Sequence, residues 1–307
     1  MNFVSQTKGK LYGAIAIFWI FISCSSQSEG RSGQNASSHA EHEILNSLPA
    51  KRLLSYWDGF NFKAKVQAGN PDAVEQKLVD FMALFSTVPD TVMQIAVHDM
   101  LKKASVEPQN FAFFLDKYNH YLYDPNSPMR NDEYYEQVLS YLAVDETLPQ
   151  EERSKYAVLL ELVRKNQVGT LAADFEFVTK DGKYRRMHEG AKPYKMLVFY
   201  DPTCTHCAAI MQDLAQTPAI HNCIENGFLE IVSVSLHPDK ASWTGYQKRI
   251  PDNWINGWDD KCSVINDGLY NIRAYPTIFL LDESNVVLLK DAPLDVTLRY
   301  LVNVVSH

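Results

Sequence analysis

The sequence predicts two structural domains: an all-helical domain over residues 41–168 and an α/β domain over residues 169–307. In the first segment, apolar residues recur at the three- and four-residue spacings of amphipathic helices. After residue 168 the pattern changes to short apolar runs separated by helical stretches, which is typical of strands alternating with helices. A chain of 307 residues is long enough for two such domains.

Five apolar stripes define the helical domain. Proline-containing breaks separate them, and no stretch alternates as a strand would. We therefore expect about five or six helices here. The stripes are Val74, Leu78, Phe81, Met82 and Phe85; Met93, Ala96, Val97, Met100 and Leu101; Phe111, Phe114, Leu115, Tyr118 and Leu122; Tyr135, Val138, Leu139 and Leu142; and Tyr156, Leu159, Leu160 and Val163.

The second domain is expected to hold a central mixed sheet with flanking helices and an N-terminal hairpin. The hairpin is indicated by two alternating runs around Asp181-Gly182. Continuous apolar runs suit buried central strands, and alternating strands and helices call for a parallel core. In chain order we expect the hairpin, a strand over 194–200, a helix from about 204, a second helix, a strand over 228–236, short helices, adjacent strands over 277–282 and 286–291, and a final amphipathic helix.

The composition is that of a folded protein, with 46% hydrophobic, 12% aromatic and 21% charged residues. The formal net charge is −8 and the isoelectric point is about 5.6. No basic stripe is visible, so the sequence argues against nucleic-acid binding.

The N-terminal 23 residues read as an export signal. Lys8 and Lys10 precede an apolar core over 11–22, which is shorter than the roughly 20 residues of a membrane-spanning helix. The sequence "FISC" then resembles a lipobox, which implies cleavage before Cys24 and lipidation of that cysteine. Residues 24–40, rich in Ser, Gly and Asn, would form a tether to the membrane. The alternative is a plain signal peptide or an uncleaved anchor.

The stretch "VFYDPTCTHCAAIMQDL" places two cysteines between a buried strand and a helix. Cys204 would face the free N–H groups and positive dipole end of that helix, so we expect its pKa to lie below the usual value of about 8.5. Cys207 follows one helical turn later on the same face. This arrangement suits a thiolate that attacks a disulfide and a second thiol that resolves the mixed disulfide.

Residues from about 169 to 305 resemble the thioredoxin-fold domains of TlpA/ResA-type thiol–disulfide oxidoreductases. The resemblance rests on "GTLAADFEFVTKDGK", "KMLVFYDPTCTHC" and "NIRAYPTIFLLDESNVVLLKD". It implies that Cys204 is the nucleophile and Cys207 the resolving thiol. It also implies that Pro276 is a cis-proline beside the cysteines and that Tyr275 offers backbone hydrogen bonds to a substrate peptide.

Some positions near the cysteines differ from this pattern. Val198 stands where thioredoxins carry a buried Asp, so the base for Cys207 is open, and Asp201 need not face inward. His206, directly before Cys207, resembles the His of protein disulfide isomerases. Its imidazolium would stabilise the Cys204 thiolate and make the disulfide more oxidising, or it is simply an exposed helix residue.

Other chemistries fit the cysteines less well. Zinc needs four ligands, and Cys223 and Cys262 form no second Cys-x-x-Cys pair, so we predict neither a metal nor a cofactor. Neither active-site cysteine has the upstream Pro and Thr of a peroxiredoxin. In an oxidising compartment Cys223 and Cys262 either pair as a structural disulfide or remain two buried thiols.

The helical domain resembles an uncharacterised domain that precedes thioredoxin-like domains in bacterial lipoproteins. The resemblance rests on "LSYWDGFNF", "YLYDPNSPMRNDEYY" and "KNQVGTLAADF" and implies no activity. Within "DPNSPMRND", Asp124, Asn126, Arg130 and Asn131 are either turn and capping residues or contacts to a client or to the second domain.

These observations predict an enzyme: a lipid-anchored, periplasm-facing thiol–disulfide oxidoreductase of the cell envelope. Its substrates would be exported proteins with cysteines, and a membrane thiol donor or oxidase would reset the cysteine pair. The alternative is a lipid-anchored binding or scaffold protein whose helical domain docks a partner and whose cysteine pair is a structural disulfide.

Overall fold

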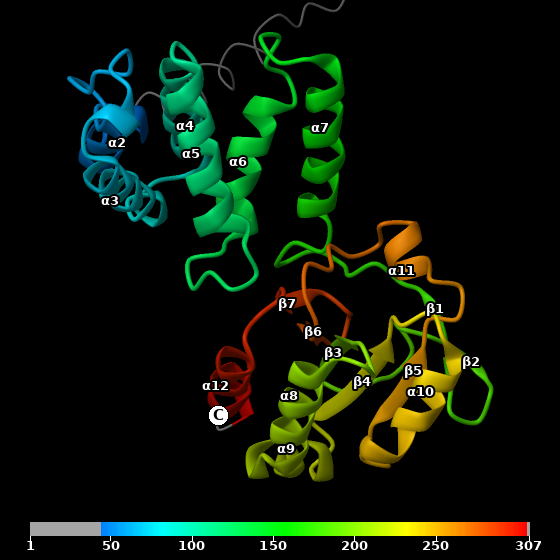
Figure 1. The fold of residues 1–307 in the computed structure, drawn as a ribbon. Helices are drawn as coiled ribbons and strands as arrows, with labels where there is room; N and C mark the ends of the chain where they lie inside the picture. Colours follow the sequence, from blue (N-terminus) through cyan, green and yellow to red (C-terminus); the bar gives the residue numbers. More distant parts are fainter. Residues whose placement is uncertain (1–43, 306–307) are drawn as a thin grey trace, which may run out of the picture. The chain divides into compact units, whose positions relative to one another are not determined.

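The structure is a computed structural model that describes residues 44–305. The predicted signal peptide, Cys24 and the tether over 24–40 lie outside the described residues. The chain divides at Lys51 into two compact units, and α2 (Leu48–Leu54) spans this division. From Arg52 onward the described chain is one compact unit made of a helical layer and an α/β layer (Figure 1). Within the described residues, no helix is long and apolar enough to cross a membrane.

The helical layer, residues 52–168, confirms the all-helical prediction. The predicted stripes supply its core, in which Leu78, Phe81 and Phe114 are fully buried. Helices begin at the predicted proline-containing breaks: Pro89 directly precedes α4, Pro108 occupies the first turn of α5, and the side chain of Asn131 caps α6. Its helices are α3 (Pro71–Met82), α4 (Asp90–Ala104), α5 (Pro108–Tyr118), α6 (Asp132–Leu142) and α7 (Gln150–Arg164), with short turns η1 (Val66–Ala68), η2 (Phe85–Thr87) and η3 (Asn119–Tyr123).

The α/β layer contains a seven-stranded mixed sheet in the order β2-β1-β5-β4-β3-β6-β7. Strands β3, β4 and β5 are parallel, whereas the hairpin β1–β2 and the pair β6–β7 add antiparallel strands at the two edges. The strands are β1 (Glu176–Thr179), β2 (Tyr184–Arg186), β3 (Tyr194–Tyr200), β4 (Leu229–Ser235), β5 (Ile255–Trp258), β6 (Thr277–Asp282) and β7 (Val287–Leu289). The helices are α8 (Thr205–Gln216), α9 (Pro218–Glu225), α10 (Lys240–Tyr246), α11 (Ser263–Asn266) and α12 (Leu294–Val305), with a short turn η4 (Gln247–Arg249).

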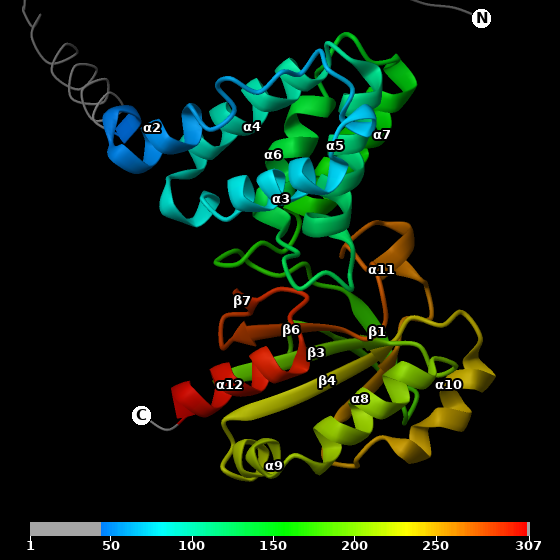
Figure 2. The ribbon, with the colours of Figure 1, turned by 60° about the vertical axis from the view of Figure 1, so that its left-hand side comes forward.

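Strand β3 is the centre of the core, as its continuous apolar run predicted. Its side chains alternate between two clusters: Met196, Val198 and Tyr200 enter one, and Leu197 and Phe199 enter the other. Helices α8, α9, α10 and α12 supply residues to the first cluster, and Figure 2 shows α8, α9 and α12 along one side of β3 and β4. Burial of both faces explains why β3 carries no polar alternation.

Strand β5 was not predicted from the sequence, which indicated only short helices between the second and third buried strands. Its four residues include Gly257, which is too short a run and too poor in β-branched residues to stand out. The glycine has a packing reason, because a Cβ at Gly257 would lie 2.1 Å from a ring carbon of Phe177. The Phe177 ring therefore requires a residue without a side chain at position 257 of β5.

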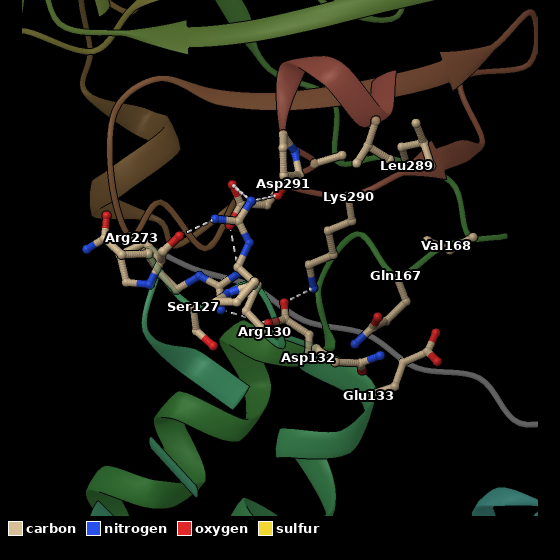
Figure 3. Close-up of a pocket in the computed structure, with 17 residues that line it drawn as sticks. Ser127, Arg130, Asp132, Glu133, Gln167, Val168, Arg273, Leu289, Lys290 and Asp291 are labelled. Carbon is tan, nitrogen blue, oxygen red and sulfur yellow. Dashed lines mark hydrogen bonds and ion pairs between the residues drawn. The ribbon is translucent and has the colours of Figure 1, made fainter. Parts of the chain in front are cut away.

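Buried ion pairs join the two layers (Figure 3). The Arg273 guanidinium lies 2.9 Å from Asp132 of α6 and 2.6 Å from Asp291, which follows β7. Lys290 Nζ lies 2.7 Å from the second oxygen of Asp132. The side chains of Arg273, Asp132 and Lys290 are only 6–7% exposed. Each charge is therefore compensated inside the protein, and not by water.

The segment "DPNSPMRND" has both of the roles that the sequence left open. Asp124 accepts a hydrogen bond from the backbone of Asn126, and Asn131 caps α6, so these residues are turn and capping residues. Arg130 instead reaches the α/β layer, where it donates to the backbone carbonyl of Asp291 and lies 3.6 Å from its carboxylate.

We predict that Asp132→Ala lowers the free energy of unfolding by about 3–5 kcal/mol, because it leaves two buried cations without their shared carboxylate. Urea titration followed by circular dichroism measures the change. Glu133→Ala is the matched control, since Glu133 is the next residue of α6 but is exposed, and its effect should stay within about 0.5 kcal/mol. Equal effects of the two variants would contradict the importance of the buried pairs.

Candidate active site

The turn between β3 and α8 positions Cys204. Strand β3 ends at Tyr200, and the Asp201 carboxylate then accepts hydrogen bonds from the backbone N–H and the hydroxyl of Thr203, both at 2.7 Å. The Asp201 carbonyl accepts the backbone N–H of Cys204 at 3.1 Å. These bonds close a tight turn and leave Cys204 as the residue that caps the N-terminus of α8.

The Cys204 sulfur acts as the cap of the helix. Its Sγ accepts a hydrogen bond from the backbone N–H of Cys207 at 3.2 Å, and the side chain is half-buried. Negative charge at this point is favoured by both the free N–H groups and the helix dipole. The structure thus places a half-buried sulfur at the N-terminus of α8, at the junction between strand and helix that the sequence indicated.

Cys207 has the opposite environment. Its side chain is fully buried in the core cluster beneath α8. Burial raises the pKa of Cys207 to about 12. The neighbouring Cys204 sulfur and the Asp201 charge also raise this pKa, whereas the backbone hydrogen bond of Asp201 lowers it. The two thiols therefore differ in accessibility, which suits an attacking first cysteine and a resolving second one.

The segment before β6 brings Tyr275 and Pro276 to the cysteines. The Tyr275–Pro276 peptide bond is cis, as the resemblance implied. The Tyr275 carbonyl oxygen lies 3.9 Å from Cys204 Sγ. Four of the predicted site residues, from β3–α8 and from the start of β6, thus meet at one point.

His206 and Val198 occupy the two positions that the sequence analysis connected with the reduction potential and with the base for Cys207. His206 is exposed on the first turn of α8, and no hydrogen bond or ion pair of its ring is found within the described part of the chain. Its tuning role stays a prediction. Val198 is fully buried and apolar, so no carboxylate lies at that position of β3, and Asp201 is the charged group that influences Cys207.

The other two cysteines within residues 44–305 are free thiols. Cys223 packs in the core on α9, and Cys262 directly precedes α11 beyond β5. The structural disulfide considered for this pair is not seen, and the alternative of a buried thiol fits Cys223. Within residues 44–305, no group of three or more His, Cys, Asp and Glu side chains is arranged to hold a metal ion.

Aromatic residues share the core cluster with Cys207. Tyr200 and Tyr246 belong to this cluster, and the Tyr200 hydroxyl donates to Asn256 at 2.9 Å. Trp243 is buried and stacks on Trp258 at 5.8 Å between ring centroids. Tyr246 and Trp243 lie more than 35 positions after Cys207, so spacing in the sequence did not connect them to the site.

Comparisons with known proteins agree with the two-layer description. Residues 52–166 match a domain of unknown function (DUF5106), and residues 193–287 match a thioredoxin-like domain. A thioredoxin-like protein from Bacteroides caccae, known from a crystal structure, is 32% identical; the match covers 84% of this chain and 95% of that one, with a TM-score of 0.77.

Two further solved structures match only part of the chain. A conserved protein of unknown function from Bacteroides fragilis is 36% identical, over 44% of this chain and 98% of that one, with a TM-score of 0.43. The thioredoxin domain of a thiol-disulfide oxidoreductase from Bacteroides vulgatus is 18% identical, over 45% of this chain and 98% of that one, with a TM-score of 0.40. No match was found among curated proteins.

We predict that Asp201→Asn lowers the pKa of Cys207, because the Asp201 charge opposes formation of a second anion beside it. The asparagine keeps an acceptor for the Thr203 N–H, so the turn is preserved. The measurement is the rate of Cys207 alkylation by iodoacetamide against pH in a Cys204→Ser background, since only the thiolate reacts.

The expected result is faster alkylation of the Asp201→Asn protein at about pH 9. Asp213→Asn, an exposed carboxylate further along α8, serves as the control and should leave the rate unchanged. A rate that is unchanged or lower in Asp201→Asn would refute the electrostatic link.

Proposed function

Because the chain belongs to the family of thioredoxin-like proteins, we propose that it is a thiol–disulfide oxidoreductase acting on protein disulfides or dithiols. The observation that carries the proposal is the position of Cys204. Its sulfur is half-buried at the N-terminus of α8, receives the Cys207 N–H and lies beside the Tyr275 carbonyl. A structural thiol would have no need of this exposure.

The proposed reaction is a pair of thiol–disulfide exchanges. The Cys204 thiolate attacks one sulfur of a client disulfide, forms a mixed disulfide, and releases the other client sulfur as a thiolate that takes up a proton. Cys207 then loses its proton and attacks Cys204 Sγ, which forms the Cys204–Cys207 disulfide and releases the second client thiol. Two electrons pass from the cysteine pair to the client, and the reverse sequence oxidises a client dithiol.

The backbone of Tyr275 would align the client during this exchange. Its carbonyl lies 3.9 Å from Cys204 Sγ, so an extended client segment passing Pro276 would run beside the attacking sulfur. A backbone contact of this kind would hold clients of different sequence in one orientation. The burial of Cys207 keeps the resolving thiol away from solvent until the mixed disulfide has formed.

The proposed location is the cell envelope, with a lipid on Cys24 as the anchor. The support is the sequence pattern of residues 1–40, and an exported protein would meet clients that carry disulfides. Fractionation of cells that express the chain with Cys24 or with Cys24→Ala tests this proposal, since loss of the lipid should release the protein from the membrane fraction.

We predict that Cys204→Ala abolishes reduction of a model protein disulfide, whereas Cys207→Ala accumulates a mixed disulfide through Cys204. Non-reducing electrophoresis with insulin as the substrate distinguishes the two. Cys223→Ala is the control and should retain the activity of the native chain, because Cys223 is a core residue of α9. A native chain whose cysteine pair resists reduction below about −300 mV would instead favour a structural disulfide and a binding role.

We predict that His206→Ala makes the reduction potential of the Cys204–Cys207 couple more negative, by roughly 30 mV or about 1.4 kcal/mol. The reason is the loss of an imidazolium that favours the thiolate of the reduced form. Equilibration with glutathione buffers measures the potential. A potential that does not change would assign His206 to the solvent-exposed surface alone.

A further inference from the structure

A groove of about 560 Å³ lies beside the proposed redox centre, and residues of both layers line it. On the α/β side it is lined by His206, which directly precedes Cys207 in the chain, and by Pro276, which follows Tyr275, whose carbonyl lies 3.9 Å from Cys204 Sγ. On the opposite side it is lined by Pro125 and Arg130, which belong to the segment between η3 and α6 of the helical layer. A client held at Cys204 would therefore also meet the helical layer.

The helical wall of the groove is fixed in place. Arg130 donates to the backbone carbonyls of Pro125 and Asp291, so one guanidinium holds the wall segment together and ties it to the α/β layer. Asp291 also receives the buried Arg273 at 2.6 Å (Figure 3). A wall anchored by buried charges keeps its position when a client binds, and this favours selection of clients by shape and charge.

The chemistry of the groove is apolar with one unpaired negative charge. Ile210, Ile278 and Leu298 supply aliphatic surface. Asp213 is exposed on α8, and no ion pair of its carboxylate is found among residues 44–305. The other charges along the groove have partners: Asp295 pairs with Arg299 at 2.7 Å, and Arg130 lies 3.6 Å from Asp291, which it shares with Arg273. The complementary occupant is a segment with an apolar and a basic side chain.

We propose that the segment around Pro125 is one wall of the client site, and that this groove selects clients with an apolar and a basic residue near the reacting cysteine. The inference rests on the proposed oxidoreductase function and adds the class of client to it. It also gives the helical layer a direct part in recognition, through a residue that lies 79 positions before Cys204 in the chain.

The test uses single-turnover reduction of peptides by the reduced full chain. Each peptide carries one cysteine in a disulfide with 2-mercaptoethanol, an adjacent leucine, and either Lys or Glu about three residues from the cysteine on either side. The cysteine pair supplies both electrons, and the products are the peptide thiol, 2-mercaptoethanol and the protein disulfide. The readout is the ratio of the rates for the Lys and Glu peptides in each protein variant.

The native chain should reduce the Lys peptide about threefold faster than the Glu peptide, which is the scale of an exposed charge pair. Asp213→Asn should bring the ratio close to one. Pro125→Lys should lower the ratio, and Pro125→Glu should raise it, because each places a charge on the helical wall. Asn126→Lys is the matched control: Asn126 is the next residue and does not line this groove, so the ratio should stay at the native value.

Two results would overturn the inference. If Pro125→Lys, Pro125→Glu and Asn126→Lys all keep the native ratio, the helical layer is not a wall of the client site. If the native ratio is one, the groove does not select basic clients. The neutral disulfide of 2-mercaptoethanol is the internal reference, and each peptide rate is divided by the rate for this compound in the same variant. A native chain that reduces neither this compound nor any peptide would refute the oxidoreductase function itself, and the client site with it.

Discussion

The buried guanidinium of Arg273 links the helical layer to the redox centre. It contacts Asp132 of α6, Asp291 after β7 and the Tyr123 carbonyl, and it lies 4.9 Å from the centre of the Tyr123 ring. A buried cation is tolerated only where such partners surround it. Arg273 stands two residues before Tyr275, whose carbonyl faces Cys204. The position of the Tyr275 backbone therefore depends on the carboxylates of Asp132 and Asp291, which come from two separate elements.

The two cysteines have different environments although they are one helical turn apart. Cys204 is the N-cap of α8, and its sulfur accepts the backbone N–H of Cys207, one of the groups that the first turn leaves free. Cys207 points into the core beneath α8, where burial raises its pKa to about 12. A half-buried sulfur at a helix N-terminus and a fully buried thiol beneath it suit the different roles proposed for the two cysteines.

Local patterns in the sequence predicted most of the fold and the centre of the site. The apolar run of β3, the capping position of Cys204 and the Tyr-Pro-Thr before β6 all carry their information within a few residues. Strand β5 was not predicted because the glycine at position 257 is required by the Phe177 ring on β1, and not by its neighbours in the chain. The buried pair of Arg273 and Asp132 was not predicted for the same reason. Its two residues are 141 positions apart in the chain, and a charged residue considered on its own is expected to be exposed.

The contact of Arg130 with Asp291 connects the two roles of the helical layer. Arg130 lines the groove beside His206, and its partner Asp291 is also a partner of Arg273. The groove wall and the support of the Tyr275 backbone thus share one carboxylate. A change that moves Asp291 would alter the shape of the groove and the alignment of the peptide at Cys204 together. This shared residue gives a physical reason for the helical layer to accompany the proposed redox centre.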